Sequence, residues 1–148
     1  MTSPDLHRAK QLLKAKESLE QRAAQRFAEA QRALREAEAR LQTLIQWQSD
    51  YTAQQQGIRQ VPRVGVLNDW RAFVEGLATQ RDRAEAELKG LRAACEERRQ
   101  AFLAALQDRK TAERYQEHIL NTEREADRKR EQRAADELAS QRRTRTTL

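Results

Sequence analysis

Residues 54–68, QQQGIRQVPRVGVLN, divide the chain and decide its fold. The residues of this stretch that disfavour a regular helix are Gly57, Pro62 and Gly65. They are informative because the whole chain has only four glycines and two prolines. The apolar residues of the stretch keep no helical period, and Asn68 is a suitable N-cap for a following helix. We therefore expect a loop over about residues 56–68, between two long helices.

The sequence before this loop has the pattern of a coiled coil. Ser3 suits the N-cap of a helix, and Asp5 favours the positive end of the helix dipole. Seam residues then recur at alternating intervals of three and four, as the a and d positions of heptads do. We expect this helix to span about residues 4–55. Its clearest seam positions are Phe27, Ala30, Leu34, Ala37, Leu41, Leu44, Gln48 and Tyr51.

The seam continues towards the N-terminus with a polar interruption. Lys16 and Glu20 fill the gap in the apolar pattern, and Leu12 and Leu19 lie off it. We therefore expect the heptad phase to shift there by a stutter. The apolar residues that extend the seam are Leu6, Ala9, Leu13 and Ala23.

The sequence after the loop has a second heptad seam. No proline occurs beyond Asn68, and seam residues again recur by threes and fours. We expect this helix to span about residues 69–140, and the basic tail, residues 141–148, to fray. The seam positions are Trp70, Phe73, Leu77, Arg81, Ala84, Leu88, Leu91, Cys95, Arg98, Phe102 and Ala105.

Two such helices joined by one loop predict an all-α fold, a long antiparallel two-helix coiled-coil hairpin. We expect a single elongated domain over residues 1–148. The composition agrees, because 35% charged and 5% aromatic residues cannot fill a thick core. They suit long helices that each bury one narrow stripe.

The two seams also suggest a register. Setting Tyr51 opposite Phe73 aligns the loop end and puts Phe27 near Arg98. In this register the second helix is the longer one, so a segment from about Asn121 to Ser140 has no partner.

The charge pattern argues against nucleic acid as a partner. The formal net charge is +6, but basic and acidic residues are interleaved. Only the last eight residues concentrate positive charge, at Arg142, Arg143 and Arg145.

Cysteine use and hydropathy indicate a compartment. The single Cys95 excludes an internal disulfide, which suits a reducing environment. The N-terminal region lacks the apolar segment of a signal peptide, and no stretch approaches the ~18 apolar residues of a membrane span. We expect a cytoplasmic protein with no direct membrane insertion.

No residue pattern indicates catalysis, a cofactor or a metal. The scattered glycines form no phosphate-binding loop, and His7 and His118 lack metal-ligand partners at helical spacing. Cys95 lies on the seam, where it fits as a small core residue, and the pair Glu96 and Glu97 lies on an open helix surface. A two-helix coil also has no cleft that excludes water. We therefore expect no enzyme, with no catalytic, cofactor-binding or metal-binding residues.

Three other features each have two interpretations. The aromatic residues beside the loop, which include Trp47 and Trp70, either close the end of the coil or form a binding patch. Gly76 and Gly90 are either tolerated or allow a partner backbone to approach, and each costs about 1 kcal/mol relative to Ala in a helix. The charged end of the second helix is either an ordinary solvated helix or a segment that inserts into a partner.

Three segments resemble the FliJ family of flagellar export proteins. They are LIQWQSDY (Leu44 to Tyr51), NDWRAFVEGLATQ (Asn68 to Gln80) and DELASQRR (Asp136 to Arg143). The length and the two-helix layout are similar across nearly the whole chain. The resemblance implies a non-enzymatic part of the type III export apparatus, similar to the stalk of a rotary ATPase.

The resemblance also implies partners. The free ends of the hairpin would enter the pore of the hexameric flagellar export ATPase, and the loop end would contact the cytoplasmic domain of the export gate. The family also handles export chaperones, which places the protein peripherally at the inner face of the cell membrane. The gate-contact residues carried over by position are Leu44, Trp47, Tyr51, Phe73, Leu77 and Gln80. The ATPase-ring contacts are Leu6, Leu13, Arg124, Arg128, Arg133 and Leu138.

Other functions stay open at this point. One alternative is the equivalent stalk of an injectisome type III secretion system, which would have the same fold and mechanism. A generic coiled-coil scaffold would need a second apolar seam, for which only Leu12 and Leu19 are candidates. A nucleic-acid binder would act through the C-terminal arginines with a steep salt dependence, and the interleaved acids disfavour it.

Overall fold

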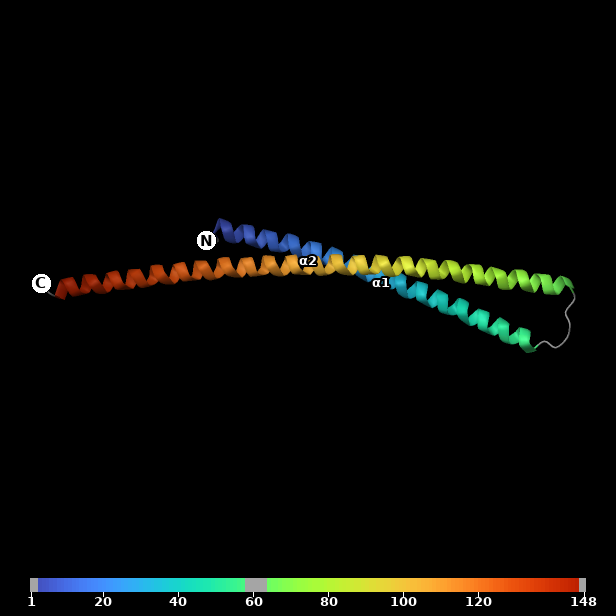
Figure 1. Ribbon diagram of the computed structural model, residues 1–148. Helices are drawn as coiled ribbons and strands as arrows, with labels where there is room; N and C mark the ends of the chain where they lie inside the picture. The colour runs from blue at the N-terminus through green and yellow to red at the C-terminus, as the bar shows by residue number, and fades with distance from the viewer. Residues whose placement is uncertain (1–2, 58–63, 147–148) are drawn as a thin grey trace. The chain divides into compact units, whose positions relative to one another are not determined.

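The computed structural model describes residues 3–57 and 64–146. Two helices make up the regular structure of these ranges, α1 (Pro4–Gly57) and α2 (Val64–Thr146) (Figure 1). The described ranges contain no strand, and the two helices pack against each other, which confirms the all-α class expected from the seams. Residues 58–63 of the expected loop lie outside the described part of the chain.

The two helix starts differ in how well the sequence predicts them. The Ser3 hydroxyl accepts a hydrogen bond from the Leu6 amide at 3.1 Å, so Ser3 caps α1 as expected. By contrast, α2 begins at Val64, and Gly65 and Asn68 are helical rather than a break and a cap. Gly65 has no positive φ, so its backbone is compatible with a continuing helix.

The C-terminal end of α2 also lies beyond its expected bound. The helix continues past Ser140 to Thr146, so the expectation of a frayed tail is wrong as far as Thr146. No Gly or Pro stops the helix there. Arg143 and Arg145 lie in its last turn, where positive charge stabilises the negative end of the helix dipole.

The two helices contribute to two compact units, each of which pairs a segment of α1 with a segment of α2. Unit 1 consists of Met1–Gln21 and Leu103–Leu148, and unit 2 consists of Arg22–Phe102. In both units the two segments run in opposite directions (Figure 1). Each unit is therefore an antiparallel pair of helical segments.

Unit 2 has an apolar seam. Its buried centre is formed by Ala37, Leu41 and Leu88. Partly buried residues pack around this centre, namely Leu34, Ile45, Ala84 and Leu91. All seven are seam positions or neighbours of seam positions, so the heptad pattern predicts this core correctly.

The register of unit 2 differs from the expected one by about one helical turn. The rings of Phe27 and Phe102 stack with centroids 6.1 Å apart, so Phe27 meets Phe102 rather than Arg98. The error comes from Tyr51, whose ring does meet Phe73 as expected, at 4.6 Å. We attribute this to a long side chain that reaches diagonally across the seam, so the contact does not mark the residues directly opposite each other.

Unit 1 keeps the heptad phase through its polar positions. Leu12 and Leu19 are exposed, at 43% and 49%. Lys16 and Glu20 are partly buried, at the spacing that continues the seam. The expected stutter is therefore wrong. The buried apolar residues of this unit are Leu6, Ala9 and Ala112.

Ion pairs replace apolar packing at the polar positions of unit 1. Arg109 donates to Glu20 at 2.8 Å and also pairs with Glu113, and Lys16 lies 3.8 Å from Asp108. The hydrogen bonds from Arg109 to Glu20 and then to Glu113 raise the pKa of its guanidinium. The side chains of Arg109 and Glu20 are only 24% and 21% exposed, so water screens this pair less than a surface pair.

The C-terminal part of α2 extends beyond the start of α1 within unit 1 (Figure 1). Partly buried residues occur as far as Ala126, and every residue from Asp127 to Thr146 is exposed. The segment of α2 that α1 does not cover therefore begins nearly two turns later than the expected Asn121, and it spans about 30 Å of helix. Neither helix, within the described residues, has a stretch both long and apolar enough to cross a membrane.

Candidate functional site

An apolar groove lies on one flank of unit 2, near the loop. Leu77 is almost fully buried at 6% exposure, whereas Trp47 and Phe73 remain 50% and 43% exposed. We call this the Trp47 groove. Its lining residues are Trp47, Tyr51, Ala72, Phe73, Gly76, Leu77 and Gln80.

Heptad spacing explains why these side chains meet. Trp47 and Gln80 each occupy the position just before a seam position, so they project along the same flank of the two paired helices. Phe73, which was expected on the seam, is 43% exposed and lies on this flank instead. Gly76 lowers the wall between them, and a Cβ atom at Gly76 would meet no other atom within 4 Å. The chain's own packing therefore does not require glycine at this position.

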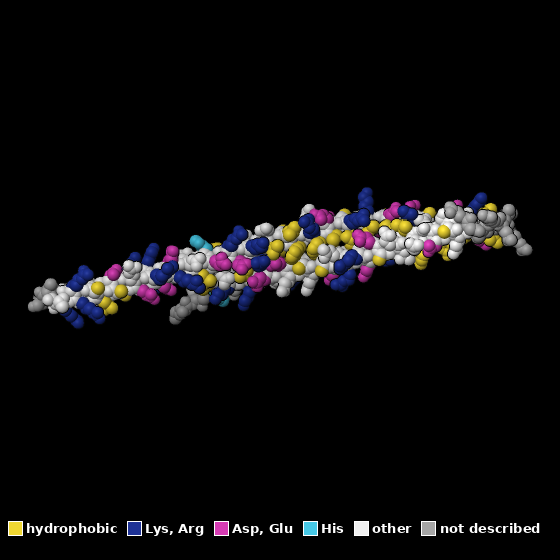
Figure 2. Space-filling model, turned by 90° about the horizontal axis from the view of Figure 1, so that it is seen from below, with side chains coloured by type: hydrophobic (Ala, Val, Ile, Leu, Met, Phe, Trp, Pro, Cys, Tyr) yellow, Lys and Arg dark blue, Asp and Glu magenta, His cyan; other side chains and the backbone are white. Residues whose placement is uncertain are grey.

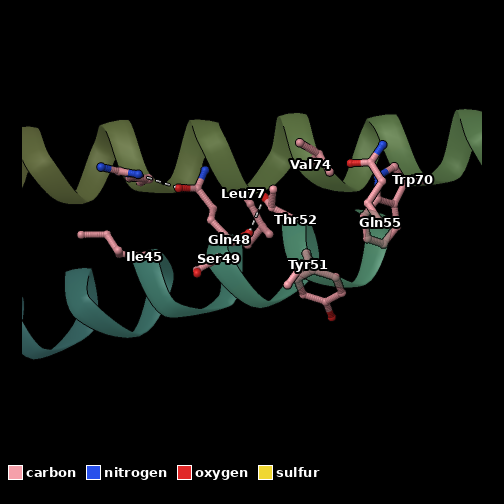
Figure 3. Close-up of a pocket in the computed structure, with 11 residues that line it drawn as sticks. Ile45, Gln48, Ser49, Tyr51, Thr52, Gln55, Trp70, Val74 and Leu77 are labelled. Atoms are coloured by element: carbon pink, nitrogen blue, oxygen red, sulfur yellow. Dashed lines mark hydrogen bonds between the residues drawn. The ribbon is translucent and has the colours of Figure 1, made fainter. Parts of the chain in front are cut away.

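A second groove lies near the same end of unit 2, across the seam (Figure 3). It shares Tyr51 and Leu77 with the first groove, and we call it the Trp70 groove. Sequence reasoning did not find it, although Ile45 and Thr52 each follow a seam position and so occupy the opposite flank. Its lining residues are Ile45, Gln48, Ser49, Tyr51, Thr52, Ala53, Gln55, Trp70, Val74, Leu77 and Arg81.

Tyr51 separates the two grooves through edge-to-face contacts. Its ring lies 5.5 Å from that of Trp70 and 4.6 Å from that of Phe73, between centroids. At the other end of the Trp70 groove, Arg81 donates to Gln48 at 2.8 Å (Figure 3). The indole Nε1 of Trp70 is buried and has no hydrogen-bond partner among the residues that the structure describes.

The structure brings most of the expected gate-contact residues together. Five of the six line the Trp47 groove, and Leu44 is half-buried on the seam instead. The five are Trp47, Tyr51, Phe73, Leu77 and Gln80. Their contact with an export gate stays a prediction, but their common surface suits apolar side chains of a partner.

The expected ATPase-ring residues do not form one surface. Leu6 is buried, and Leu13 is half-buried on the seam. The other four, which are Arg124, Arg128, Arg133 and Leu138, are exposed on α2. Successive residues turn by about 100° around a helix, so Arg128 and Leu138 each lie about 40° from Arg124, whereas Arg133 lies on the opposite side.

The described part of the chain contains one free thiol and no cluster of potential metal ligands. Within it, no group of three or more His, Cys, Asp and Glu side chains is placed to hold a metal ion. Cys95 is a free, half-buried thiol of the seam. On the face drawn in Figure 2, basic and acidic side chains are interleaved. The surfaces that this arrangement offers to a partner include the Trp47 groove, the Trp70 groove and the exposed end of α2.

Comparison with known proteins gives one match. Residues 6–147 match the model of a family described as "Flagellar FliJ protein". No curated protein and no solved structure matches the chain.

Proposed function

Because the chain belongs to the FliJ family, and so is a component of flagellar type III protein export, we propose that it is a non-enzymatic stalk and adaptor. In this proposal unit 1 engages the hexameric flagellar export ATPase, and unit 2 engages the cytoplasmic domain of the export gate. Export chaperones are further partners. The protein would be peripheral to the inner face of the cell membrane through these contacts.

The observation that carries the proposal is the segment of α2 that extends beyond the start of α1. From Asp127 to Thr146 the helix is exposed all round, with both signs of charge. Helices in proteins gain most of their stability from packing, so a surrounding partner would stabilise this exposed segment. A single helix is about 10–12 Å wide, which is narrow enough to enter a ring.

One face of this segment suits an acidic ring lining. Its residues follow one another by threes and fours and none of them is acidic, although Glu131 lies at its edge, about 20° around the helix from Arg124. Alanines between the arginines allow close approach, and arginine forms paired hydrogen bonds with carboxylates. We call this face the arginine stripe. It consists of Asn121, Arg124, Arg128, Gln132, Ala135, Ala139, Arg142 and Thr146.

This stripe refines the expected ring contacts. Arg124 and Arg128 would contact the ring directly, with Leu138 at the edge of the same face, whereas Arg133 lies on the opposite side of the helix. Leu6 and Leu13 would act indirectly, because they pack unit 1 and so hold the base of the projecting segment in place.

The test combines binding with ATP hydrolysis. Full-length protein and a chain ending at Ala126 would be compared for pull-down of the export ATPase of the same genome and for stimulation of its activity. We expect the full chain to bind and stimulate, and the shortened chain to lose both effects. Equal binding and stimulation by the shortened chain would overturn the stalk proposal.

Matched charge variants test the stripe separately. The triple variant Arg124→Gln, Arg128→Gln, Arg142→Gln removes three positive charges from the stripe. The control Lys129→Gln, Arg130→Gln, Arg133→Gln removes three from other sides of the same segment. We expect only the first triple variant to lose stimulation, and equal loss in both would point to net charge rather than to this face.

A further inference from the structure

We propose that residues 4–20 of α1, which we call the N-terminal arm, open reversibly from α2 while the helical segments of unit 2 stay paired. Unit 1 then has a closed form, with the contacts of the structure, and an open form in which α1 no longer covers α2 from about Leu103 onward. The proposal concerns the free protein and does not rest on the ATPase or gate contacts.

The face of α2 that the arm covers alternates small and polar residues. Arg109 meets Glu20 across the seam at 2.8 Å. One heptad from that pair, Gln116 lies opposite Leu13, and both residues line the same groove of unit 1. Closing the arm therefore takes polar side chains of α2 partly out of water. The seam residues of α2 in this unit are Ala105, Arg109, Ala112, Gln116, Ile119, Glu123 and Ala126.

The arm contributes few large apolar side chains to the seam. Of its five seam residues, only Leu6 and Leu13 are both large and apolar, and the others are Ala9, Lys16 and Glu20. The seam of unit 2 has instead a leucine-rich centre and a pair of stacked aromatic rings. Because the burial of apolar surface stabilises paired helices most, α2 holds the arm less strongly than it holds the rest of α1.

The ion pairs of unit 1 allow the arm to open without leaving a buried charge unpaired. Arg109 also pairs with Glu113 of α2 itself, and this pair remains when the arm leaves. The other pair across the seam joins Lys16 and Asp108, whose side chains are already 32% and 64% exposed, so water solvates both readily. Opening therefore avoids the large penalty of breaking an ion pair whose remaining partner stays buried.

Opening would lengthen the part of α2 that is free of α1. In the closed form α2 is exposed from Asp127 to Thr146, which is about 30 Å of helix. In the open form it is uncovered from about Leu103, which is about 65 Å. A ligand that binds the uncovered seam face of α2 would shift the equilibrium towards the open form.

Hydrogen exchange of the full-length protein, resolved by residue with NMR, measures the opening. Amides that exchange through one shared opening have equal protection, whereas protection rises gradually along a helix end that merely frays. We expect residues 8–20 to share one protection factor, about tenfold or more below that of residues 34–44 in unit 2. A gradual rise from residue 8 to residue 20, or protection equal to that of unit 2, would overturn the proposal.

A matched pair of variants tests whether the arm opens as one unit. Gln116→Leu places an apolar side chain opposite Leu13 and so stabilises the closed form, which should raise the protection of all residues 8–20 about tenfold. The control Gln107→Leu makes the same substitution at an exposed position of α2 outside the seam, and it should change nothing. Circular dichroism confirms that both variants are folded. If Gln116→Leu protects only the residues from Leu13 inward, the end frays residue by residue and the proposal is wrong.

Discussion

At the scale of single residues, two glycines of α2 allow an effect on binding to be distinguished from an effect on helix stability. Gly76 and Gly90 both face open space where a Cβ atom would lie, so neither is required by the fold. Gly76 lines the Trp47 groove, whereas Gly90 lines neither the Trp47 groove nor the Trp70 groove. The difference suggests that Gly76 serves a partner, whereas Gly90 serves none that the described residues reveal.

We expect Gly76→Ala and Gly90→Ala each to raise the free energy of unfolding by about 1 kcal/mol, because Ala is the better helix former. Urea unfolding followed by circular dichroism measures this. Gly76→Ala should also weaken binding to the cytoplasmic domain of the gate in calorimetry, since its methyl group fills the Trp47 groove. Equal weakening by Gly90→Ala would contradict the assignment of the groove.

Some residues of the site could be predicted from the sequence, and others could not. Trp47 and Gln80 share a flank because of heptad spacing, which is a local property, whereas the heptad pattern placed the exposed Phe73 on the seam. The partnership of Glu20 with Arg109 joins residues 89 positions apart, and one sequence does not reveal it. The same holds for the unpaired indole of Trp70, because hydrogen-bond satisfaction depends on the final packing.

At the scale of elements, the seam of unit 1 depends on a polar layer. Arg109 and Glu20 occupy positions that apolar residues fill in unit 2. Polar residues at such positions commonly fix the register of a coiled coil and lower its stability. The heptads predict which residues face the seam, but the register needed the contact between Phe27 and Phe102.

We expect Arg109→Leu alone to lower the melting temperature, because it leaves Glu20 partly buried without its closest partner. The double variant Glu20→Leu, Arg109→Leu should melt higher than the single variant and no lower than the native chain, since leucines pair well across the seam. Thermal unfolding at low and high salt measures both effects. A double variant less stable than Arg109→Leu would show that an apolar pair cannot replace the ion pair between Glu20 and Arg109.

At the scale of the whole molecule, the proposed partners use different units. The Trp47 groove belongs to unit 2, and the projecting segment of α2 belongs to unit 1. Two partners can then be lost independently by changes in one chain. This division follows from the length of α2, which the sequence predicts only approximately because no residue marks where pairing with α1 ends.

We expect Trp47→Ala to lower affinity for the gate domain about tenfold or more, as exposed aromatic hot spots do, and to leave ATPase stimulation unchanged. A chain ending at Ala126 should show the converse. Binding and hydrolysis assays on the same preparations measure both. Loss of both activities in either variant would show that the two regions do not act separately.

The two grooves of unit 2 share Tyr51 and Leu77, and this sharing has a thermodynamic consequence. A ligand that turns the Tyr51 ring towards one groove alters the wall of the other. Linkage then makes the effect reciprocal, so each ligand changes the affinity of the other by the same factor. Through the ring of Tyr51, occupation of one groove would thereby change the affinity of the other groove for its ligand.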